Sequence, residues 1–155
     1  MSLLPPIELI SYAAERLGSI RGQVTFLGGA VFALLVTEQG AKPPRRTKDV
    51  DVAIELTSRL GFYELEEALR ARGFENSMES PICRFKHGVI ILDVMPTDPA
   101  ILGFSNSWYP ASIRTSQRHT LENGITINLI TPACFLATKM EAFDSPTRDG
   151  HVICM

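Results

Sequence analysis

The sequence has few cysteines, and their spacing excludes a common kind of metal site. Only three are present, Cys83, Cys134 and Cys154, and no two of them form a Cys-x-x-Cys pair. This spacing gives no zinc-binding pattern, and a small, odd number of cysteines is typical of a reduced protein. We therefore expect a cytoplasmic location.

Long apolar runs and a strong net charge are also missing. No stretch reaches the roughly 18 residues of a membrane-spanning helix, and the N-terminal residues lack the basic segment of a signal peptide. We therefore expect no membrane partner. The net charge of −2 at pH 7 argues against a strongly basic surface for nucleic acid, although it leaves a local basic patch open.

The composition is that of an ordinary globular protein. The chain has 155 residues, of which 45% are hydrophobic and 21% are charged. A chain of this length buries roughly 70% of its unfolded surface, so it needs no disulfide to fold. We expect a single domain over residues 1–155.

A pair of glycines separates a short apolar strand from a helical pattern. Residues 24–27 are predicted as the strand and residues 30–39 as the helix, with Gly40 as its stop. Gly28 and Gly29 form the turn between them, where glycine lets the backbone approach a ligand closely. The N–H groups at the start of a helix favour an anion. The pattern predicts a cradle for the phosphates of a nucleoside triphosphate.

Two carboxylates follow at alternating positions of a second strand. Alternate side chains of a strand share a face, so Asp49 and Asp51 point the same way, while Val50 and Val52 point to the core. Two neighbouring carboxylates repel each other and one pKa rises, unless a cation lies between them. Mg²⁺ commonly binds one or two carboxylates together with substrate phosphates. The pair therefore predicts a site for Mg²⁺ or Mn²⁺.

The loop before this strand, residues 41–48, holds four cations and two prolines. It can be a solvated loop, as most charge runs are. The functional interpretation is that Arg46 or Lys48 contacts the triphosphate or the acceptor, because the loop leads directly into Asp49.

A third carboxylate lies in a later apolar strand. Residues 82–95 are predicted as a β-hairpin around a His87-Gly88 turn. The second strand is apolar except for Asp93, and such a run implies burial on both faces. A buried carboxylate needs a metal or hydrogen-bond donors. The alternative is a strand-end aspartate that faces solvent.

A lysine lies in the last predicted helix, residues 132–143. Lys139 shares a face with Leu136, Met140 and Phe143. Its side chain either extends to water along the apolar surface or reaches into the site.

The remaining segments are assigned packing or connecting roles. Residues 5–17 and 61–74 are predicted as amphipathic helices, and residues 125–129 as a strand. Residues 103–119 show little periodicity and are predicted as irregular. The helix at 61–74 allows a crossover connection between the strands of Asp51 and Asp93.

The order of these motifs resembles the nucleotidyltransferase superfamily of the DNA polymerase beta type. The motifs are the Gly28-Gly29 turn, the Asp49-Val50-Asp51 strand and Asp93. The segments TKDVDVAI and LATKMEAF are similar to those of bacterial abortive-infection nucleotidyltransferase toxins and their relatives. The resemblance covers roughly residues 20–143.

The resemblance implies a minimal α/β (α+β) nucleotidyltransferase fold, a mixed β-sheet with helices packed mainly on one face. It implies metal-dependent transfer of a nucleoside monophosphate to a hydroxyl of RNA, a protein or a small molecule. Asp49, Asp51 and Asp93 would bind the metal ions, and Lys139 would contact the triphosphate. A cognate antitoxin would be a partner if the resemblance to the toxins holds. Relatives continue into further helices, which we expect to be absent or truncated here.

Two rival interpretations stay open at this stage. The first is a non-catalytic nucleotide-binding or protein-interaction module that retains the fold. The second is a purely structural core in which the three aspartates cap strand ends, and it predicts that Asp49, Asp51 and Asp93 do not converge.

Overall fold

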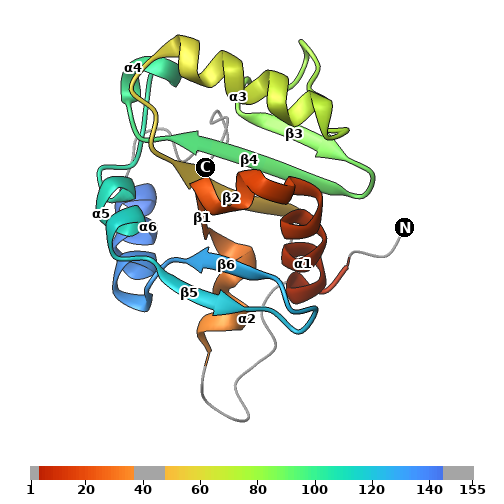
Figure 1. The fold of residues 1–155 in the computed structure, drawn as a ribbon. Coiled ribbons are helices and arrows are strands. Elements are labelled where there is room, and N and C mark those ends of the chain that lie inside the picture. The colour runs from red at the N-terminus through yellow and green to blue at the C-terminus, as the bar shows by residue number, and fades with distance from the viewer. Residues whose placement is uncertain (1–3, 37–47, 145–155) are drawn as a thin grey trace.

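The computed structural model describes residues 4–36 and 48–144 (Figure 1). Six strands form one sheet in the order β3-β4-β2-β1-β6-β5. Their bounds are β1 Val24–Leu27, β2 Asp49–Ile54, β3 Arg84–His87, β4 Ile90–Pro96, β5 Gln117–Thr120 and β6 Thr126–Leu129. β2 is parallel to β4 and β1 is parallel to β6, whereas the other neighbours are antiparallel. The sheet is therefore mixed, as predicted.

The helices of the described residues range from one turn to three. They are α1 Pro6–Leu17, α2 Phe32–Leu35, α3 Arg59–Ala71, α4 Pro99–Leu102, α5 Tyr109–Arg114 and α6 Pro132–Asp144, and two 3-10 segments cover Gly18–Gln23 and Gly29–Val31. The three longer helices match the predicted ones within a few residues. None of the described helices is long and apolar enough to cross a membrane.

Two of the long helices, α1 and α3, cover one face of the sheet. The contacts of His87 on β3 place both helices on that face, because Tyr12 of α1 and Phe74, just after α3, each pack edge-on against its ring. The inward side chains of β2 and β4, such as Val52 and Leu92, are fully buried there. This face is the hydrophobic core, and it leaves the opposite face to the carboxylates.

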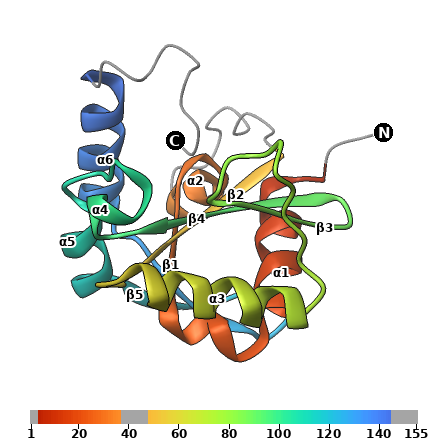
Figure 2. The same cartoon turned by 90° about the horizontal axis from the view of Figure 1, so that it is seen from above.

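The helices α5 and α6 lie together at one end of the sheet, as both ribbon views show (Figures 1 and 2). α5 contacts β1 and β2. It lies within residues 103–119, which we predicted as irregular, so that prediction was wrong. The helix has only six residues, which is too short to show a clear periodic pattern in the sequence. Pro110 occupies its first turn, and a proline suits that position.

The helix after the glycine pair is shorter than predicted. The chain forms a 3-10 segment over Gly29–Val31 and then four residues of α-helix, and Val36 is already extended. Beta-branched valine has a reduced helix propensity, which fits an exit at this point. The predicted helix therefore ends at Leu35 within residues 4–36, and the rest of its predicted range, residues 37–39, lies outside the described part of the chain.

The hairpin between β3 and β4 turns one residue later than predicted. His87 pairs with Ile90, so the two turn residues are Gly88 and Val89. Gly88 has φ of 59°. Hairpin turns of two residues need positive φ at their first central position, and glycine adopts this without strain, whereas His87 would not.

A first prediction concerns the start of α3. Ser58 is the N-cap, and its hydroxyl accepts a hydrogen bond from the Gly61 N–H at 3.0 Å. Loss of such a cap typically costs about 1 kcal/mol, which is about 2–4 °C in melting temperature at this chain length. We expect Ser58→Ala to show this loss in a thermal melt and Ser58→Asp, which retains a cap, to show little. Equal melting temperatures for the alanine and aspartate variants would contradict the capping role.

Candidate active site

The three predicted aspartates lie on the face of the sheet opposite the α1 and α3 helices. Asp49 and Asp51 alternate with buried Val50 and Val52 along β2. Asp51 is the direct cross-strand neighbour of Asp93 on β4. The aspartates therefore share one face on adjacent strands, in contrast to the interpretation in which they cap separate strand ends.

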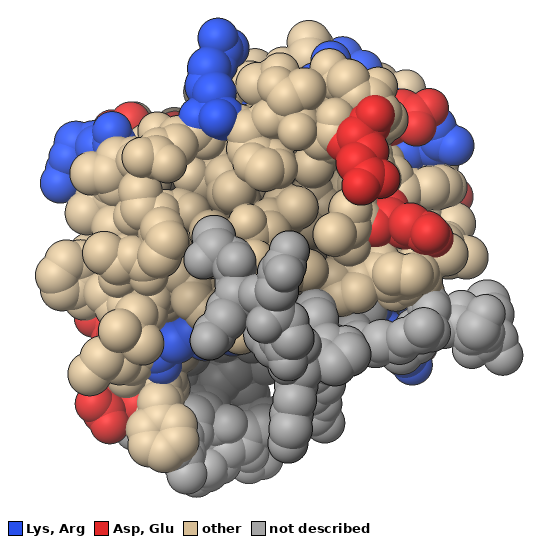
Figure 3. Space-filling model, turned by 90° about the horizontal axis from the view of Figure 1, so that it is seen from below, with Lys and Arg blue, Asp and Glu red and all other residues tan. Residues whose placement is uncertain are grey.

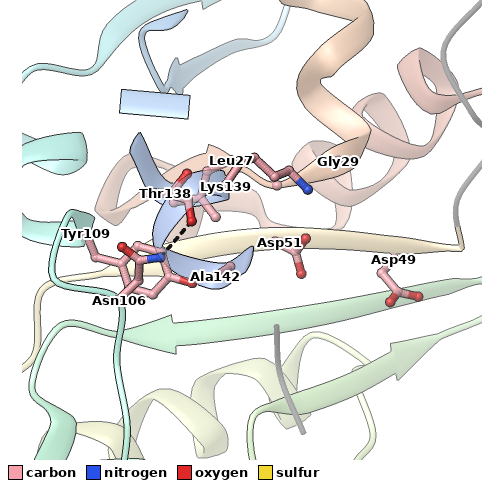
Figure 4. Close-up of a pocket in the computed structure, with 10 residues that line it drawn as sticks. Leu27, Gly29, Asp49, Asp51, Asn106, Tyr109, Thr138, Lys139 and Ala142 are labelled. Atoms are coloured by element: carbon pink, nitrogen blue, oxygen red, sulfur yellow. Dashed lines mark hydrogen bonds between the residues drawn. The ribbon is translucent and has the colours of Figure 1, made fainter. Parts of the chain in front are cut away.

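A pocket opens beside Asp51, with a volume of about 210 Å³. Three separate parts of the chain line it: the glycine turn after β1, the carboxylates of β2 and the α5–α6 pair (Figure 4). The lining residues are Leu27, Gly28, Gly29, Asp49, Asp51, Asn106, Tyr109, Thr138, Lys139 and Ala142. Five of the predicted site residues therefore meet in one cavity, although Asp93 does not line it.

Gly28 is required by the close approach of Asp51. Its backbone has φ of 78° and ψ of −172°, a region that essentially only glycine occupies. A Cβ at this position would lie 2.0 Å from Asp51 Oδ2. The glycine turn and the carboxylate strand are thus packed directly against each other, backbone to side chain.

Lys139 reaches from α6 to the glycine turn. Its Nζ lies 3.9 Å from the point where a Cβ on Gly29 would stand and 5.7 Å from the centre of the Phe135 ring. In Figure 4 the side chain extends toward Gly29, above the carboxylates of β2. Of the two interpretations left open, the structure favours the one in which Lys139 reaches into the site.

The helix α6 does not bury the apolar stripe that the sequence suggests. Leu136, Met140 and Phe143 are each about 60% exposed or more, whereas Cys134 and Thr138 are the buried side chains of this helix. Lys139 therefore lies between the solvent-exposed stripe and the pocket.

Hydrogen bonds anchor α6 to the segment before α5. Asn106 Nδ2 donates to the Thr138 carbonyl at 2.9 Å, and Asn106 Oδ1 accepts from the Trp108 N–H at 3.0 Å. Glu141 accepts hydrogen bonds from the backbone N–H and the hydroxyl of Ser107. These contacts fix the turn of α6 that carries Lys139. The sequence pattern assigned neither Asn106 nor Glu141 to the site.

The carboxylates of the pocket resist ionisation. Burial raises the pKa of Asp51 to about 7, and the charges of Asp93 and Asp49 contribute further. Burial and the charge of Asp93 also raise the pKa of Asp49, against the opposing charges of Arg84 and Lys48. Lys139 has a smaller, lowering effect on the pKa of Asp51. The site therefore has an excess of negative charge when its carboxylates ionise.

Arg84 on β3 is a site residue that sequence reasoning missed. Its Nε donates to Asp93 Oδ1 at 2.9 Å and its Nη2 donates to Asp93 Oδ2 at 3.0 Å. The same Nη2 lies 3.4 Å from Asp49 Oδ2. Asp93 is thus buried with a charged partner, and the alternative of a solvent-facing strand end is wrong.

Burial also affects Tyr109, which lines the pocket from α5. Desolvation raises the pKa of its phenol, and the charge of Asp51 adds to the effect. Tyr109 lies in the segment that we predicted as irregular, and its buried side chain forms a wall of the pocket.

The predicted basic contacts have different outcomes. Lys48 is exposed and close enough to Asp49 to lower the pKa of that carboxyl, but it does not line the pocket. Arg46 lies outside the described residues. On the face seen in Figure 3, the Lys and Arg side chains of described residues do not gather into one patch.

A divalent cation fits the donor set of the pocket. Within residues 4–36 and 48–144, no three His, Cys, Asp or Glu side chains are grouped to hold a metal ion, so the predicted three-carboxylate site stays a prediction. Asp49 and Asp51 nevertheless share the pocket, and the pKa of each is raised by burial and by neighbouring carboxylates. Two carboxylates with room for phosphate oxygens are a donor set that Mg²⁺ uses.

Neither protein-family models nor the sequences of curated proteins give a match to this chain. Solved structures do. One is the crystal structure of an antigenic nucleotidyltransferase-like protein from Paracoccidioides brasiliensis, with a TM-score of 0.53 and 23% sequence identity. The match covers 85% of this chain and 63% of that one, so this chain spans less than two thirds of its neighbour. The fold resembles that of this nucleotidyltransferase-like protein. This confirms the predicted α+β fold class with its mixed sheet; the resemblance to the abortive-infection toxins stays a prediction.

Proposed function

We propose that the protein is a metal-dependent nucleotidyltransferase that transfers a nucleoside monophosphate from a nucleoside triphosphate to an acceptor hydroxyl. One observation carries the proposal. A single pocket brings together a strand-following glycine turn, two same-face carboxylates and a lysine that reaches to the turn. The nucleotidyltransferase-like fold of the neighbour supports it.

The proposed reaction is an in-line displacement at the α-phosphorus. A bond forms between the acceptor oxygen and the α-phosphorus, and the bond from that phosphorus to the bridging oxygen of the β-phosphate breaks. Pyrophosphate leaves, and the hydroxyl proton passes to a carboxylate of the site and then to water. No oxidation or reduction is involved.

Each pocket residue has a part in this scheme. Asp49 and Asp51 would hold Mg²⁺ or Mn²⁺, which when bound offsets charge on the phosphate oxygens. The backbone of Gly28 and Gly29 would lie against the outer phosphates, because no side chain keeps them at a distance. Lys139 would neutralise charge that develops on the leaving pyrophosphate.

The size of the pocket indicates which part of the nucleotide it takes. At about 210 Å³ it is smaller than the roughly 300–1,000 Å³ of typical ligand sites. We propose that it receives the phosphate end and that the base extends beyond it. The acceptor would carry its hydroxyl on RNA, a protein or a small molecule, and an antitoxin partner stays a proposal that depends on the toxin resemblance.

Calorimetric titration tests the proposal before the acceptor is known. Each of the four nucleoside triphosphates is titrated into the protein with and without Mg²⁺, and we expect binding that depends on Mg²⁺. A hydrogen bond to a charged group contributes about 1.5–3 kcal/mol, so Lys139→Met should weaken binding at least tenfold. The matched control is Lys86→Met, an exposed lysine of β3 that does not line the pocket. Absence of Mg²⁺-dependent binding for all four nucleotides would favour a non-catalytic module.

A further inference from the structure

Arg84 and Asp93 form a two-pronged ion pair at the base of the carboxylate cluster. The pair joins adjacent positions of the antiparallel strands β3 and β4. Both oxygens of Asp93 accept from Arg84, at 2.9 and 3.0 Å. The planar guanidinium matches a carboxylate in this geometry, which makes the pair stronger than a single charged hydrogen bond.

Burial makes this pair hard to separate. The Asp93 side chain is 2% exposed and that of Arg84 is 28% exposed. The hydrogen bond to Asp93 is the main reason that the pKa of Arg84 is raised. Breaking a buried pair leaves an uncompensated charge in a poorly solvated place, so a metal ion would need to replace the guanidinium to gain Asp93 as a ligand.

The charge of the cluster gives a second argument. Arg84 also approaches Asp49, at 3.4 Å, so one guanidinium serves two of the three carboxylates. Counting only these four side chains, three ionised carboxylates and one guanidinium have a net charge of −2, which one divalent ion would balance.

We propose that Arg84 is a positioning residue that keeps Asp93 from coordinating metal, so that the site takes one divalent cation on Asp49 and Asp51 and uses the guanidinium in place of a second. This inference rests on the proposed function. It assigns Asp93 a supporting role, in contrast to the metal-ligand role that the sequence resemblance implies.

The contact with Asp49 gives Arg84 its influence on the site. Because the guanidinium is held by Asp93, it presents Nη2 to Asp49 from a fixed direction. Asp49 is thereby oriented while Asp51 faces the glycine turn. Lysine would retain the positive charge but not the two-pronged hydrogen bonding of the guanidinium. We therefore expect Arg84→Lys to bind one divalent ion, as the wild type does, but more weakly.

Counting bound Mn²⁺ by electron paramagnetic resonance tests the inference. The protein is titrated with Mn²⁺ in the presence of an α,β-methylene analogue of the best-binding nucleoside triphosphate, which cannot release pyrophosphate. We expect one ion per chain in the wild type and two in Arg84→Met, where Asp93 is released. Asp93→Asn should keep one ion with an affinity within about threefold, whereas Asp51→Asn should lose it.

The outcomes separate the inference from the function on which it rests. Two ions in the wild type, one ion in Arg84→Met, or equal losses in Asp93→Asn and Asp51→Asn would each overturn the role of Arg84 and leave the nucleotidyltransferase proposal standing. Absence of any Mn²⁺ bound with nucleotide would overturn both. Thermal melts show whether each variant folds. If either single variant does not fold, the double variant Arg84→Met/Asp93→Asn takes its place, because it removes both charges of the pair together. We expect this double variant to bind one ion.

Discussion

Replacing Asp51 by asparagine is expected to abolish metal-dependent nucleotide binding and, at pH 8, to raise the melting temperature of the metal-free protein. Both effects have one origin. Burial and two neighbouring carboxylates raise the pKa of Asp51 to about 7, so its ionised form is unfavourable until a cation arrives. Asparagine has nearly the same shape as the neutral acid and cannot ionise. It therefore removes the metal ligand and the repulsion together.

The pH dependence has a definite sign. The folded protein holds the Asp51 proton more tightly than the unfolded chain, whose carboxyl has its ordinary pKa of 3.8. As the pH rises from about 4 to about 7, the unfolded chain ionises first and the wild type loses stability. Above the folded pKa the penalty is complete. The asparagine variant escapes it, so the two proteins should have similar melting temperatures near pH 4 and diverge toward pH 8.

The size of the difference follows from the same pKa. Each tenfold difference in proton affinity is about 1.4 kcal/mol, which makes a few kcal/mol the upper bound at pH 8. At about 2–4 °C for each kcal/mol, we expect the variant to melt roughly 5 °C higher there. Mg²⁺ with nucleotide should raise the melting temperature of the wild type only.

The control for this experiment is Asp144→Asn, an exposed aspartate at the end of α6. It should leave both the melting temperature and nucleotide binding unchanged across the same pH range. A melting temperature for Asp51→Asn that falls below the wild type at pH 8 would contradict the electrostatic account, and retained Mg²⁺-dependent binding would contradict the assignment of Asp51.

The placement of the carboxylates was predictable because a strand has a period of two. Alternation along DVDV is enough to put Asp49 and Asp51 on one face, and the crossover helix makes β4 a parallel neighbour of β2. The sequence pattern therefore predicted that Asp93 lies on the strand next to that of Asp51, whereas the pairing of these two residues also depends on the register of the strands.

Arg84 was not predictable because its position depends on the register of a hairpin. A turn at His87-Gly88 would pair Arg84 with Ile91 and place Ile82 opposite Asp93. The observed turn at Gly88-Val89 pairs Arg84 with Asp93 instead. An error of one residue in the turn thus shifts the pairing by two, which keeps every side chain on its face but changes its partner across the strands.

The other missed residues depend on contacts between distant segments. Asn106 reaches the Thr138 carbonyl across 32 positions of the chain, and no local pattern encodes such a contact. Lys139 was identified from its place in an apolar stripe and from the resemblance of its segment, LATKMEAF, to the nucleotidyltransferase toxins. The stripe is solvent-exposed, so the first of these reasons was inaccurate even though the position of Lys139 in the pocket agrees with the prediction.

Replacing Gly28 by alanine is expected to destabilise the protein and to disrupt the packing of the glycine turn against the carboxylate strand. Two costs add. The backbone of Gly28, with φ of 78° and ψ of −172°, costs a residue with a Cβ about 1–3 kcal/mol. The new Cβ would also lie 2.0 Å from Asp51 Oδ2 and 2.8 Å from Asp51 Cβ. Asp51 or the turn must therefore move, and β1 pairs directly with β2 at this point.

We expect the melting temperature of Gly28→Ala to fall by about 5–10 °C and its Mg²⁺-dependent nucleotide binding to disappear. Gly29→Ala is the matched control. Gly29 has no positive φ, and the nearest atom to its added Cβ would be Lys139 Nζ at 3.9 Å. It should melt within about 2 °C of the wild type. Equal losses in the two variants would show that the turn is merely sensitive to any side chain.

A second variant separates the backbone cost from the clash. In Gly28→Ala/Asp51→Ala the contact at 2.0 Å is gone, while the unfavourable backbone angles and the 2.8 Å approach of the two Cβ atoms stay. We expect the double variant to recover part of the lost melting temperature and none of the nucleotide binding. Such a result would show that Gly28 is required for two reasons, its backbone conformation and the space that it leaves for the Asp51 carboxylate. That carboxylate lowers the stability of the metal-free protein, so its presence is explained by function and not by stability.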